Sequence, residues 1–564
     1  YPLRMKKLTR PNCKIPLVRQ KKGIFTLQEM IEQSCKAYGD NLAYSITRES
    51  GIYKLSFNEV LKLVKKFAMH LHCLGLKKGD HIAILGENCP EWVISFFAVN
   101  WIGGVSIPLD AKAKSEELKF ILNFSDTKAV ISSNSFSEKL KSIKESVTKL
   151  ELILEFKDIE KICEKYREGI EKSDSKPDDL CDILFTSGTT GNPKGVMLTN
   201  KNIMSNVEDM YSFLDISVGD TAFSVLPIHH AYERTCGILA TFYSGVHLFF
   251  SRSVKPREML EDLQNSKPTI WLNAPLILEK LYYRVNKELE SQKGLKGLII
   301  KILPKKIIGK KVRKTLGLEK IRFIFCGGAA LSANISKGLK QFGFPVIQGY
   351  GLSETSPLIS ANPPSRPKNE SVGMIVESDE VEIRNIDNDG NGEIWVKGPN
   401  IMKGYYKNEE ATKEIFEGEW LDTGDVGYFD LSSYLYINGR KKNIIVTKGG
   451  KNIYPEEIEE LLTKSRLIAE ALVFSPDDSR VQAIIYPDFE EINFIYKKEF
   501  NLKNREGLLE LIDGEIKNVN KGLQSYKRIN YFAIRLEEFP KTTTRKIKRF
   551  CFNNIKLNDN RGFI

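Results

Sequence analysis

Short apolar segments alternate with amphipathic segments through the first two-thirds of the chain. Apolar runs of four to six residues predict strands, whereas apolar residues at i, i+3 and i+4 spacing predict helices. Strands are expected at 81–85, 129–132, 269–273 and 321–326, and two of the helices at 59–74 and 116–123. Strands that alternate with helices are typical of parallel βαβ layers, so this part of the chain is predicted to be α/β.

The pattern changes between 381 and 436, where strands are separated by turns instead of helices. The run Asp387-Asn388-Asp389-Gly390-Asn391-Gly392 is a strong turn signal and predicts a small β-barrel-like unit at about 372–438. A polar loop at 171–179 leads into a buried strand at 181–185. A second break at 439–442 precedes a strand at 443–447, a helix at 455–463 and a strand at 471–475, which predict a smaller α+β domain.

A chain of 564 residues is too long for one hydrophobic core, which favours at least two domains. We therefore expect a large N-terminal domain of βαβ layered sheets at 1–440 and a smaller C-terminal domain at 441–564. The most apolar window, 92–109, contains Asn100, two consecutive glycines and Pro108. It is predicted to be a buried helix followed by a strand, in preference to a membrane span.

Composition narrows the range of partners. The net charge of +12 favours anionic partners such as nucleotides, coenzyme A or an acidic membrane surface. The nine cysteines are widely spaced without a C-x-x-C pair, and the six histidines form no metal-binding pattern, so neither a disulfide framework nor a zinc site is expected. Residues 1–20 are basic and lack an apolar segment, unlike a secretory signal. A cytoplasmic location is expected.

The strongest motif is a glycine-rich loop that follows the strand at 181–185. It combines hydroxyls, glycines and one lysine within ten residues: Thr186, Ser187, Gly188, Thr189, Thr190, Gly191, Asn192, Pro193, Lys194 and Gly195. Glycine lets backbone amides approach a phosphate, hydroxyls donate hydrogen bonds and lysine neutralises charge, so the loop is predicted to cradle a polyphosphate. It is not a Walker A loop, because Gly195 and not Ser or Thr follows the lysine. A surface loop of turn residues is the alternative.

This loop and five later segments, in the same order, resemble the motifs of the adenylate-forming superfamily, which includes acyl- and aryl-CoA ligases, luciferases and peptide-synthetase adenylation domains. The later segments are 327–330, 348–355, 423–425, Arg440 and 540–549. The resemblance covers most of the chain. It implies an ATP and AMP site formed by Thr186, Ser187, Gly188, Thr189, Thr190, Gly191, Lys194, Gly328, Ala329, Ala330, Gln348, Gly349, Tyr350, Gly351, Thr355, Asp425, Arg440 and Lys546.

Individual roles follow from the same resemblance. Tyr350 is expected to stack on adenine, Thr355 to lie near the α-phosphate and Asp425 to bind the ribose hydroxyls. Thr186 and Glu354 are expected to hold Mg²⁺, a hard cation that prefers oxygen ligands. Two alternatives remain: a closely packed strand-to-helix turn at 327–330, and a solvated surface carboxylate at Glu354.

The C-terminal motif resembles the segment that carries the family's catalytic lysine, here Lys546. Arg545 stands where the family has glycine, which changes the conformations open to the loop. A basic, solvated tail is the alternative interpretation of this segment. The resemblance also implies a mobile C-terminal domain that rotates about Lys442 between two half-reactions, bringing Gly449, Gly450 and Lys451 to a coenzyme A channel.

The acid is expected to be a long-chain fatty acid. Gly351 replaces a bulky tryptophan found in acetate-specific relatives, and 227–234 resembles the long-chain version of the motif that gates the carboxylate. His230 in that motif is a candidate contact for the acid or the thiol, although a satisfied structural histidine is the alternative. The residues 351–357 and 446–452 also look most like long-chain synthetases.

The implied reaction has two steps, because a free carboxylate has no good leaving group. The carboxylate attacks the α-phosphate of ATP to give acyl-AMP and pyrophosphate, and the thiol of coenzyme A then displaces AMP. Lys546, Lys194, Glu354 and His230 are the expected catalytic residues, with Mg²⁺ assisting charge stabilisation. The partners are therefore a fatty acid, ATP and coenzyme A, without nucleic acid, and the oligomeric state stays open.

The window 291–320 contains ten Lys or Arg residues and one acid, Glu319, interleaved with apolar clusters. A basic amphipathic surface is consistent with peripheral attachment to anionic lipid on the inner membrane face. A lysine-decorated helix pair packed on the core is the alternative, which the sequence slightly favours.

Three other functions compete with a fatty acid–CoA ligase. An acyl-acyl-carrier-protein synthetase would share every adenylation residue and differ only in the thiol acceptor. A peptide-synthetase module is disfavoured because 18 residues follow Lys546, too few for a carrier domain. A non-catalytic lipid- or nucleotide-binding relative is disfavoured because Lys546, Glu354 and Lys194 are all present.

Overall fold

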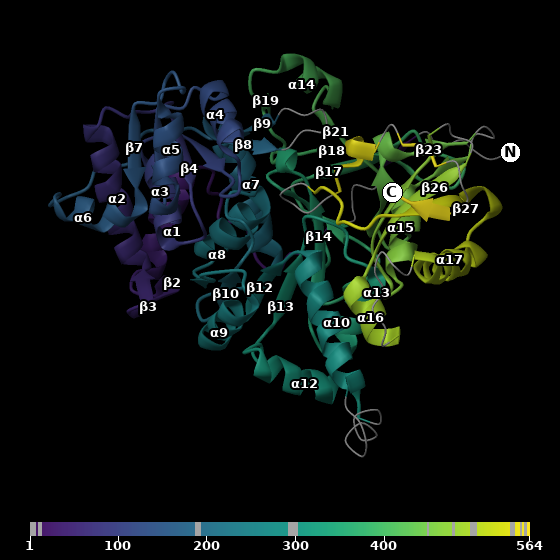
Figure 1. The fold of residues 1–564 in the computed structure, drawn as a ribbon. Helices are drawn as coiled ribbons and strands as arrows, with labels where there is room; N and C mark the ends of the chain where they lie inside the picture. The colour runs from purple at the N-terminus through teal and green to yellow at the C-terminus, as the bar shows by residue number, and fades with distance from the viewer. Residues whose placement is uncertain are drawn as a thin grey trace.

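A computed structural model describes residues 7–9, 14–186, 193–291, 303–447, 451–476, 480–496, 505–541, 547–552, 555–557 and 561–564. Two large sheets with helices between and around them form most of the molecule, and a smaller α+β unit lies at one end (Figure 1). The predicted fold class, a large layered α/β domain followed by a smaller C-terminal domain, is confirmed.

In the larger sheet several parallel strands end at the same edge. Its nine described strands are, in order, β16 (Met374–Ile375), β15 (Leu358–Ala361), β14 (Val346–Gly351), β13 (Phe323–Cys326), β12 (Ile270–Asn273), β10 (Thr221–Ser224), β11 (His247–Phe250), β2 (Leu42–Arg48) and β3 (Gly51–Ser56). The strands from β14 to β2 are parallel. The carboxyl ends of β12, β13 and β14 therefore meet, which is where α/β sheets bind ligands.

The second sheet ends in a hairpin. Its described strands are, in order, β19 (Gly404–Tyr405), β9 (Lys194–Thr199), β8 (Leu180–Thr186), β5 (Val105–Leu109), β4 (His81–Leu85), β6 (Ala129–Ser132) and β7 (Leu152–Glu155). From β8 to β7 the pairs are parallel, whereas β8, β9 and β19 pair antiparallel. The glycine-rich segment thus joins two antiparallel strands.

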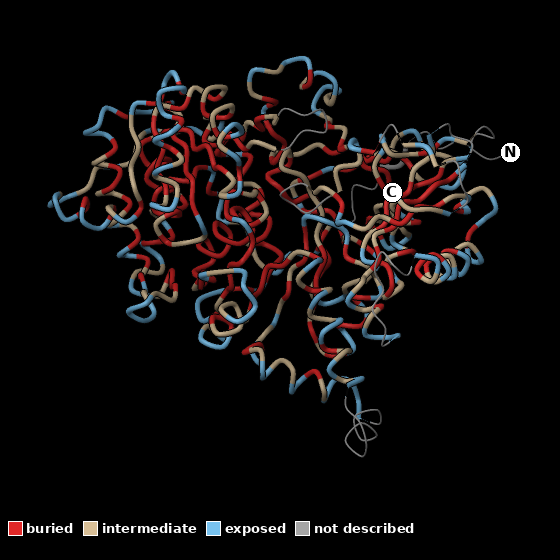
Figure 2. Tube along the Cα trace, in the orientation of Figure 1, coloured by how far each residue is buried: buried red, intermediate tan, exposed pale blue. Residues whose placement is uncertain are grey.

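A layer of helices between the two sheets forms the main core. It includes α1 (Leu27–Tyr38), α2 (Phe57–Cys73), α3 (Pro90–Trp101), α7 (Asn200–Phe213) and α8 (Ala240–Tyr243). In α3 every residue except Glu91 is buried, and the helix contacts β4 and β5 of one sheet and β2 of the other. This confirms the buried helix and strand predicted for 92–109. Burial is concentrated in these layers (Figure 2).

The remaining helices of this large unit cover the outer faces or the sheet ends, except for the buried π-helix η3 (Tyr232–Leu239), which packs on α7, α8 and β10. These remaining helices are α4 (Ser115–Phe124), η1 (Asn134–Phe136), α5 (Ser137–Lys144), η2 (Phe156–Asp158), α6 (Ile159–Glu164), η3, α9 (Pro256–Ser266), α10 (Pro275–Ser291), α12 (Lys305–Thr315), α13 (Ala333–Gln341), η4 (Ser353–Thr355) and α14 (Glu409–Ile415). None of the helices that the structure describes combines the length and apolarity required to span a bilayer.

A third sheet follows the two large ones. Its described strands are β1 (Lys7–Thr9), β17 (Glu380–Arg384), β18 (Gly392–Lys397), β21 (Trp420–Phe429), β20 (Phe416–Glu417) and β22 (Leu435–Arg440). The predicted turn at 387–392 joins β17 to β18, whose register pairs Arg384 with Glu393. The small β unit is therefore present, and β1 from the other end of the chain completes it.

The C-terminal unit has its own core, which includes Ile458, Val473 and Ile512. Its elements are η5 (Lys441–Asn443), β23 (Ile445–Val446), β24 (Asn452–Ile453), α15 (Pro455–Thr463), β25 (Ile468–Phe474), β26 (Val481–Pro487), α16 (Phe489–Tyr496), α17 (Arg505–Gly522), η7 (Ser525–Lys527), β27 (Ile529–Ile534), η8 (Arg549–Phe552) and β28 (Arg561–Phe563). Only Ile445–Val446 of the strand predicted at 443–447 is extended, because 441–443 forms a 3-10 turn.

The C-terminal unit docks against the end of α10. Arg466 lies 2.9 Å from Glu290 of α10 and also pairs with Glu491 of α16, and Lys287 of α10 lies 3.8 Å from Glu491. Ion pairs at this level of exposure contribute little each, about 0–1 kcal/mol. These ion pairs orient the C-terminal unit, but little free energy is lost when they break, which is compatible with a domain that changes position.

Candidate active site

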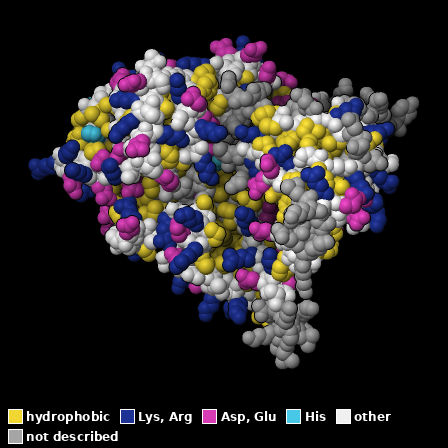
Figure 3. Space-filling model, viewed as in Figure 1, with side chains coloured by type: hydrophobic (Ala, Val, Ile, Leu, Met, Phe, Trp, Pro, Cys, Tyr) yellow, Lys and Arg dark blue, Asp and Glu magenta, His cyan; other side chains and the backbone are white. Residues whose placement is uncertain are grey.

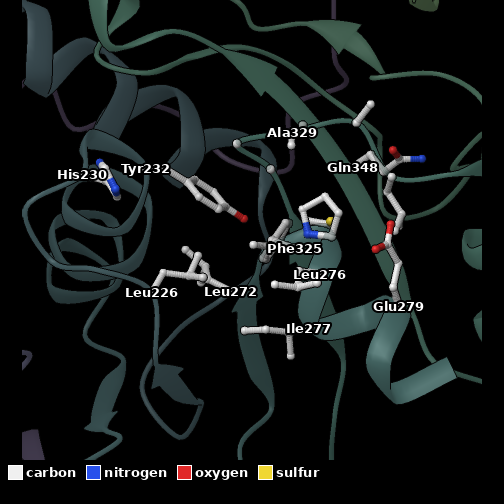
Figure 4. Close-up of a pocket in the computed structure, with 18 of the residues that line it drawn as sticks. Leu226, His230, Tyr232, Leu272, Leu276, Ile277, Glu279, Phe325, Ala329 and Gln348 are labelled. Atoms are coloured by element: carbon white, nitrogen blue, oxygen red, sulfur yellow. The ribbon is translucent and has the colours of Figure 1, made fainter. Parts of the chain in front are cut away.

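A cavity of about 2850 Å³ lies where the two large sheets, the third sheet and the C-terminal unit meet. Apolar side chains line the hollow between the two halves of the molecule on the face shown in Figure 3. The close-up in Figure 4 shows His230 and Tyr232 on one side of the cavity, with Gln348 and Glu279 on the other. Motifs far apart in the sequence therefore share one enclosed space.

The glycine-rich loop is the tip of the β8–β9 hairpin. Thr186 pairs with Lys194 across it, and both residues line the cavity. The predicted phosphate contacts Ser187, Gly188, Thr189, Thr190 and Gly191 lie outside the described residues. The helix α7 begins only after β9, so the described chain continues from this loop into a strand and not directly into a helix.

Glu354 and Lys194 are connected through Tyr405, which the sequence did not single out. The Tyr405 hydroxyl donates a hydrogen bond of 2.8 Å to Glu354 Oε1, and Lys194 Nζ lies 4.8 Å from the centre of the Tyr405 ring. Burial, with the Glu354 carboxylate as the second cause, raises the pKa of Tyr405. Tyr405 reaches this place because β19 pairs with β9, and no local sequence pattern marks that pairing.

The turn after β13 is shaped by close contacts. Gly328 has φ of 82°, a backbone conformation that favours glycine. A Cβ at Gly327 would lie 3.1 Å from the ring of Tyr232, so packing also requires a small residue there. Gly328, Ala329 and Ala330 all line the cavity, which keeps this turn available to a flat ring. The two interpretations of this motif, close packing and ligand space, are therefore compatible.

Tyr350, Asp425 and Arg440 form a connected polar group on one wall. The Tyr350 hydroxyl donates to Asp425 Oδ2 at 2.5 Å, and Arg440 Nε lies 2.8 Å from Asp425 Oδ1. Asp425 and Arg440 face each other across the β21–β22 pair. Burial and the neighbouring carboxylate raise the pKa of Tyr350 well above its usual value. Next to this group Gln348 donates to the carbonyl of Asn369 at 2.6 Å, while Gly349 also lines the cavity.

Two residues have tasks that differ from the expected ones. Thr355 is fully buried, its hydroxyl donates to the carbonyl of Pro357 at 2.6 Å, and it does not line the cavity. It pins the turn after β14 and does not offer its hydroxyl to a nucleotide here. A Cβ at Gly351 would lie 1.6 Å from the Pro357 carbonyl oxygen. The neighbouring backbone thus requires glycine at 351, which therefore says nothing about the depth of an acid pocket.

His230 is a half-buried, neutral imidazole at the cavity wall. Its ring centre lies 4.0 Å from that of His229, and its Nε2, a buried atom, has no hydrogen-bond partner among the described residues. Burial, followed by the effect of His229, lowers the pKa of His230 to about 3. A buried polar atom left unpaired costs about 1–3 kcal/mol, which favours a ligand as its partner. The alternative of a satisfied structural histidine is not supported.

The C-terminal motif reaches the same cavity. Lys546 and Arg545 lie outside the described residues, but Lys541 pairs with Ile547, so the two ends of this loop are adjacent. Lys541, Ile547, Lys548 and Arg549 all line the cavity. Lys442 lies in the exposed turn η5 and also lines it. Gly449 and Gly450 are outside the described residues, and Lys451 is exposed and does not line the cavity.

The oxygen donors at the hairpin suit a hard cation. Thr186 and Glu354 offer a hydroxyl and a carboxylate at the cavity wall, the donor types that Mg²⁺ accepts along with water and substrate phosphates. Within the described ranges no group of three or more His, Cys, Asp or Glu side chains could hold a metal. This agrees with an ion held mainly by a nucleotide, whose negative charge it would neutralise.

Comparison with known proteins identifies the family. The AMP-binding enzyme family matches residues 31–406, and the AMP-binding enzyme C-terminal domain matches residues 442–553. The chain is 29% identical over 497 residues to a long-chain-fatty-acid–CoA ligase of Bacillus subtilis, covering 80% of this chain and 83% of that one. It is 28% identical over 557 residues to a chloroplastic long-chain-fatty-acid–[acyl-carrier-protein] ligase of Arabidopsis thaliana, covering 81% and 76%.

A solved structure shows the same architecture. The o-succinylbenzoate CoA synthetase of Bacillus subtilis, in complex with its acyl-adenylate intermediate, superposes with a TM-score of 0.74 at 25% identity. The similarity covers 94% of this chain and 99% of that one. It therefore extends over both the large α/β unit and the C-terminal unit.

The buried state of His230 gives a testable pH dependence. Because burial lowers its pKa to about 3, the imidazole should stay neutral between pH 5 and pH 8. The unfolded chain takes up this proton near pH 6.5, so the histidine should reduce folding stability as the pH falls below that value. NMR of histidine-labelled protein, with the signal assigned through His230→Gln, measures the titration. A midpoint near 6.5 would contradict the burial described here.

Proposed function

The chain belongs to the AMP-binding enzyme family as an ATP-dependent, adenylate-forming acyl- or aryl-CoA ligase, and on that basis we propose that its acid is a long-chain fatty acid. The observation that carries the proposal is the apolar extension of the cavity away from His230. This extension is lined by Leu272, Phe325, Leu263, Ile277, Ile308 and Val312, from β12, β13, α9, α10 and α12.

The extension is long enough for such a chain. Residues of α10 from Pro275 to Leu289 line the cavity, which is about 21 Å along a helix that rises 1.5 Å per residue. One leaflet of a bilayer, which one acyl chain spans, is roughly 15 Å thick, half of the hydrocarbon core. Each buried methylene contributes about 0.8 kcal/mol, close to a fourfold change in affinity. A long acid would therefore bind far better than acetate.

The polar end supports adenylate formation. We assign Lys194 and the hairpin to the outer phosphates of ATP, Asp425 and Arg440 to the ribose, and Tyr350 with the 327–330 turn to adenine. The Asp425 carboxylate and Arg440 guanidinium already hold each other in place at 2.8 Å, so they would bind with little further ordering. His230, neutral and unpaired at Nε2, stands between this end and the apolar extension.

In the first half-reaction an acid oxygen attacks the α-phosphorus of ATP and pyrophosphate leaves. Positive charge is required where the two anions meet, and we assign that task to Lys546. The placement of Lys541 and Ile547 on the cavity wall supports this, because they flank the lysine loop. In the second half-reaction the thiol of coenzyme A attacks the acyl carbon and AMP leaves with the electron pair of the broken bond.

We propose that the domains are 1–440 and 441–564 and that the second rotates about Lys442 between the half-reactions. The exposed turn η5 and the weak ion pairs at Glu290 and Glu491 would permit such a rotation. Lys541 and Ile547, which flank the lysine loop, line the cavity whereas Lys451 does not. This arrangement fits the adenylate-forming half-reaction, after which Gly449, Gly450 and Lys451 would approach the thiol channel.

A carrier protein is the alternative thiol acceptor. The similarity to the acyl-carrier-protein ligase of Arabidopsis thaliana supports keeping it, because the adenylation residues would be the same. Coupled assays of the same protein with coenzyme A and with acyl carrier protein separate the two. If the thioester forms faster on acyl carrier protein than on coenzyme A, the carrier protein is the acceptor.

We further propose that α12 attaches to anionic lipid from which the acid enters. Ile307, Ile308 and Val312 of α12 line the cavity, and Ile307, at its rim, is 54% exposed. Four exposed lysines surround it: Lys305, Lys306, Lys310 and Lys311. The helix packs on the core through Gly309, where a Cβ would lie 1.7 Å from the Phe342 carbonyl oxygen. Core packing and a lipid-facing side are compatible. The protein would then be cytoplasmic and peripheral on the inner membrane face.

Narrowing the extension should change the preferred acid. Val312→Trp places a large ring in the cavity, so we expect kcat/KM for palmitate to fall at least tenfold while octanoate changes less than threefold. The assay is AMP release with coenzyme A over acids from acetate to oleate. Lys310→Trp, on the same helix but off the cavity wall, should behave as wild type. If wild type prefers acetate or benzoate to palmitate, the long-chain proposal is wrong.

Removing the loop lysine should separate the half-reactions. Lys546→Ala should reduce acid-dependent pyrophosphate exchange by at least a hundredfold, because charge at the α-phosphorus is no longer compensated. Thioester formation from supplied acyl-AMP should stay within about fivefold of wild type. Lys521→Ala, at an exposed lysine of the same unit that is off the cavity wall, is the control. Equal loss in both half-reactions would contradict the domain-rotation account.

Charge removal on α12 should weaken membrane binding. Each lysine near an anionic surface contributes about 1 kcal/mol, so replacing Lys305, Lys306, Lys310 and Lys311 by Gln should lower vesicle affinity on the order of a hundredfold or more. Sedimentation with vesicles containing phosphatidylserine measures this, and pure phosphatidylcholine vesicles are the control. Unchanged binding, or no binding by wild type, would reject the membrane proposal.

A further inference from the structure

We propose that Asp182 and Arg234 are positioning residues that hold the turn bearing His230 in register with the phosphate-binding hairpin. Asp182 lies on β8, and Arg234 lies in the π-helix η3 directly after the histidines. Neither touches the cavity wall. The inference rests on the proposed role of His230 at the acid carboxylate, and it adds the ion pair that holds His230 in position.

The two side chains form a fully buried ion pair. Asp182 and Arg234 each have 0% relative exposure, and Arg234 Nη2 contacts Asp182 Oδ2 directly. The second oxygen, Asp182 Oδ1, accepts a hydrogen bond of 2.7 Å from the Ser106 hydroxyl on β5. The carboxylate is thus fixed to two neighbouring strands of one sheet while it binds a cation from outside that sheet.

Arg234 in turn bonds to the backbone of both histidines. Its Nη1 donates to the carbonyl of His229 at 2.9 Å, and its backbone amide donates to the carbonyl of His230 at 3.0 Å. Asp110, directly after β5, lies nearby, with its Oδ2 3.9 Å from His229 Nε2, which is too far for a hydrogen bond. The backbone on both sides of the His230 side chain is therefore held by groups that connect it to β5 and β8.

The same strand carries the phosphate end of the site. Residues two and four apart on a strand lie on one face, and Leu184 and Thr186, two and four residues after Asp182, both line the cavity. At about 3.3 Å per residue, Asp182 lies roughly 13 Å along β8 from the hairpin residue Thr186. One rigid strand thus connects the ion pair to the hairpin, and the ion pair connects it to His230.

Stability alone does not account for this pair. Burying two charges is costly, and replacement of such a pair by apolar side chains of similar size is often neutral or stabilising. Arg234 Nε also lacks a hydrogen-bond partner, which adds to the cost. What an apolar pair would not supply is the directed bond to the His229 carbonyl. The short π-helix that begins at Tyr232 is a further sign of function, since such segments occur often at functional sites.

The test compares single and paired replacements. Asp182→Asn should lower kcat/KM for the fatty acid in pyrophosphate exchange by 10-fold to 100-fold, with KM for ATP within twofold of wild type. Asp182→Leu combined with Arg234→Met should recover the Tm lost in the single variant but not the activity toward the acid. If the double variant recovers activity together with Tm, the pair is only structural and the proposal is wrong.

Two further variants keep the test decisive. Ser106→Ala removes only the hydroxyl that binds Asp182, so it should fold and show the same acid-specific loss in a milder form, about threefold to tenfold. Asp209→Asn disrupts another ion pair of a buried carboxylate, 2.6 Å from the half-buried Lys21 and off the cavity wall. It should lower Tm, but it should not produce a loss that is specific to the acid as compared with ATP. If Ser106→Ala affects the acid and ATP alike, as Asp209→Asn is expected to do, the proposal is wrong.

The outcome is independent of the exact acid. The comparison uses whichever acid the wild type activates best in the panel from acetate to oleate. A wild type that shows no acid-dependent exchange, or prefers a short acid, counts against the proposed function. A wild type that activates a long acid, with an Asp182→Asn variant that affects acid and ATP alike, counts only against the positioning role.

Discussion

The carboxylate of an acid and the triphosphate of ATP repel each other, so a site that joins them must supply positive charge where they meet and exclude water there. The cavity changes character at that point. Lys194, Arg440 and Lys541 lie at one end, and apolar side chains line the other. His230, neutral and half-buried, marks the boundary. The apolar residues that would select the acid and the charged residues that would act on the phosphate thus lie on different walls of one cavity.

The fold brings these walls together from three sheets. The parallel strands β12, β13 and β14 end at the cavity, the β8–β9 hairpin enters from the second sheet, and Asp425 and Arg440 come from the third. A rigid connection is needed between the first two, because their separation decides whether the two anions meet. The buried pair of Asp182 and Arg234 lies on that connection. The C-terminal unit is connected to the rest of the molecule by the ion pair of Arg466 with Glu290 and by hydrogen bonds from Tyr454 and Asn452 to Asp387.

Local pattern and motif order predicted much of this organisation. The strands β4 and β6 and the helix α15 match their predicted bounds, and α2 and α4 differ by one or two residues, since their apolar periodicity is strong. The relation of Tyr405 to Glu354 was not predictable, because it depends on the pairing of β19 with β9. Gly351 lines the cavity as well as packing on Pro357, whereas the Thr355 hydroxyl bonds the Pro357 carbonyl and Thr355 is not on the cavity wall. Motif spacing identifies a site but does not say which member faces the ligand.

The most direct test is a crystal structure with a palmitoyl-adenylate analogue in which a sulfamoyl group replaces the phosphate. The account predicts adenine against the 327–330 turn, ribose at Asp425, and the acyl chain running past His230 between the β12–β13 strands and the helices α10 and α12. An acyl chain directed into solvent, or an adenylate bound away from the β8–β9 hairpin, would contradict it.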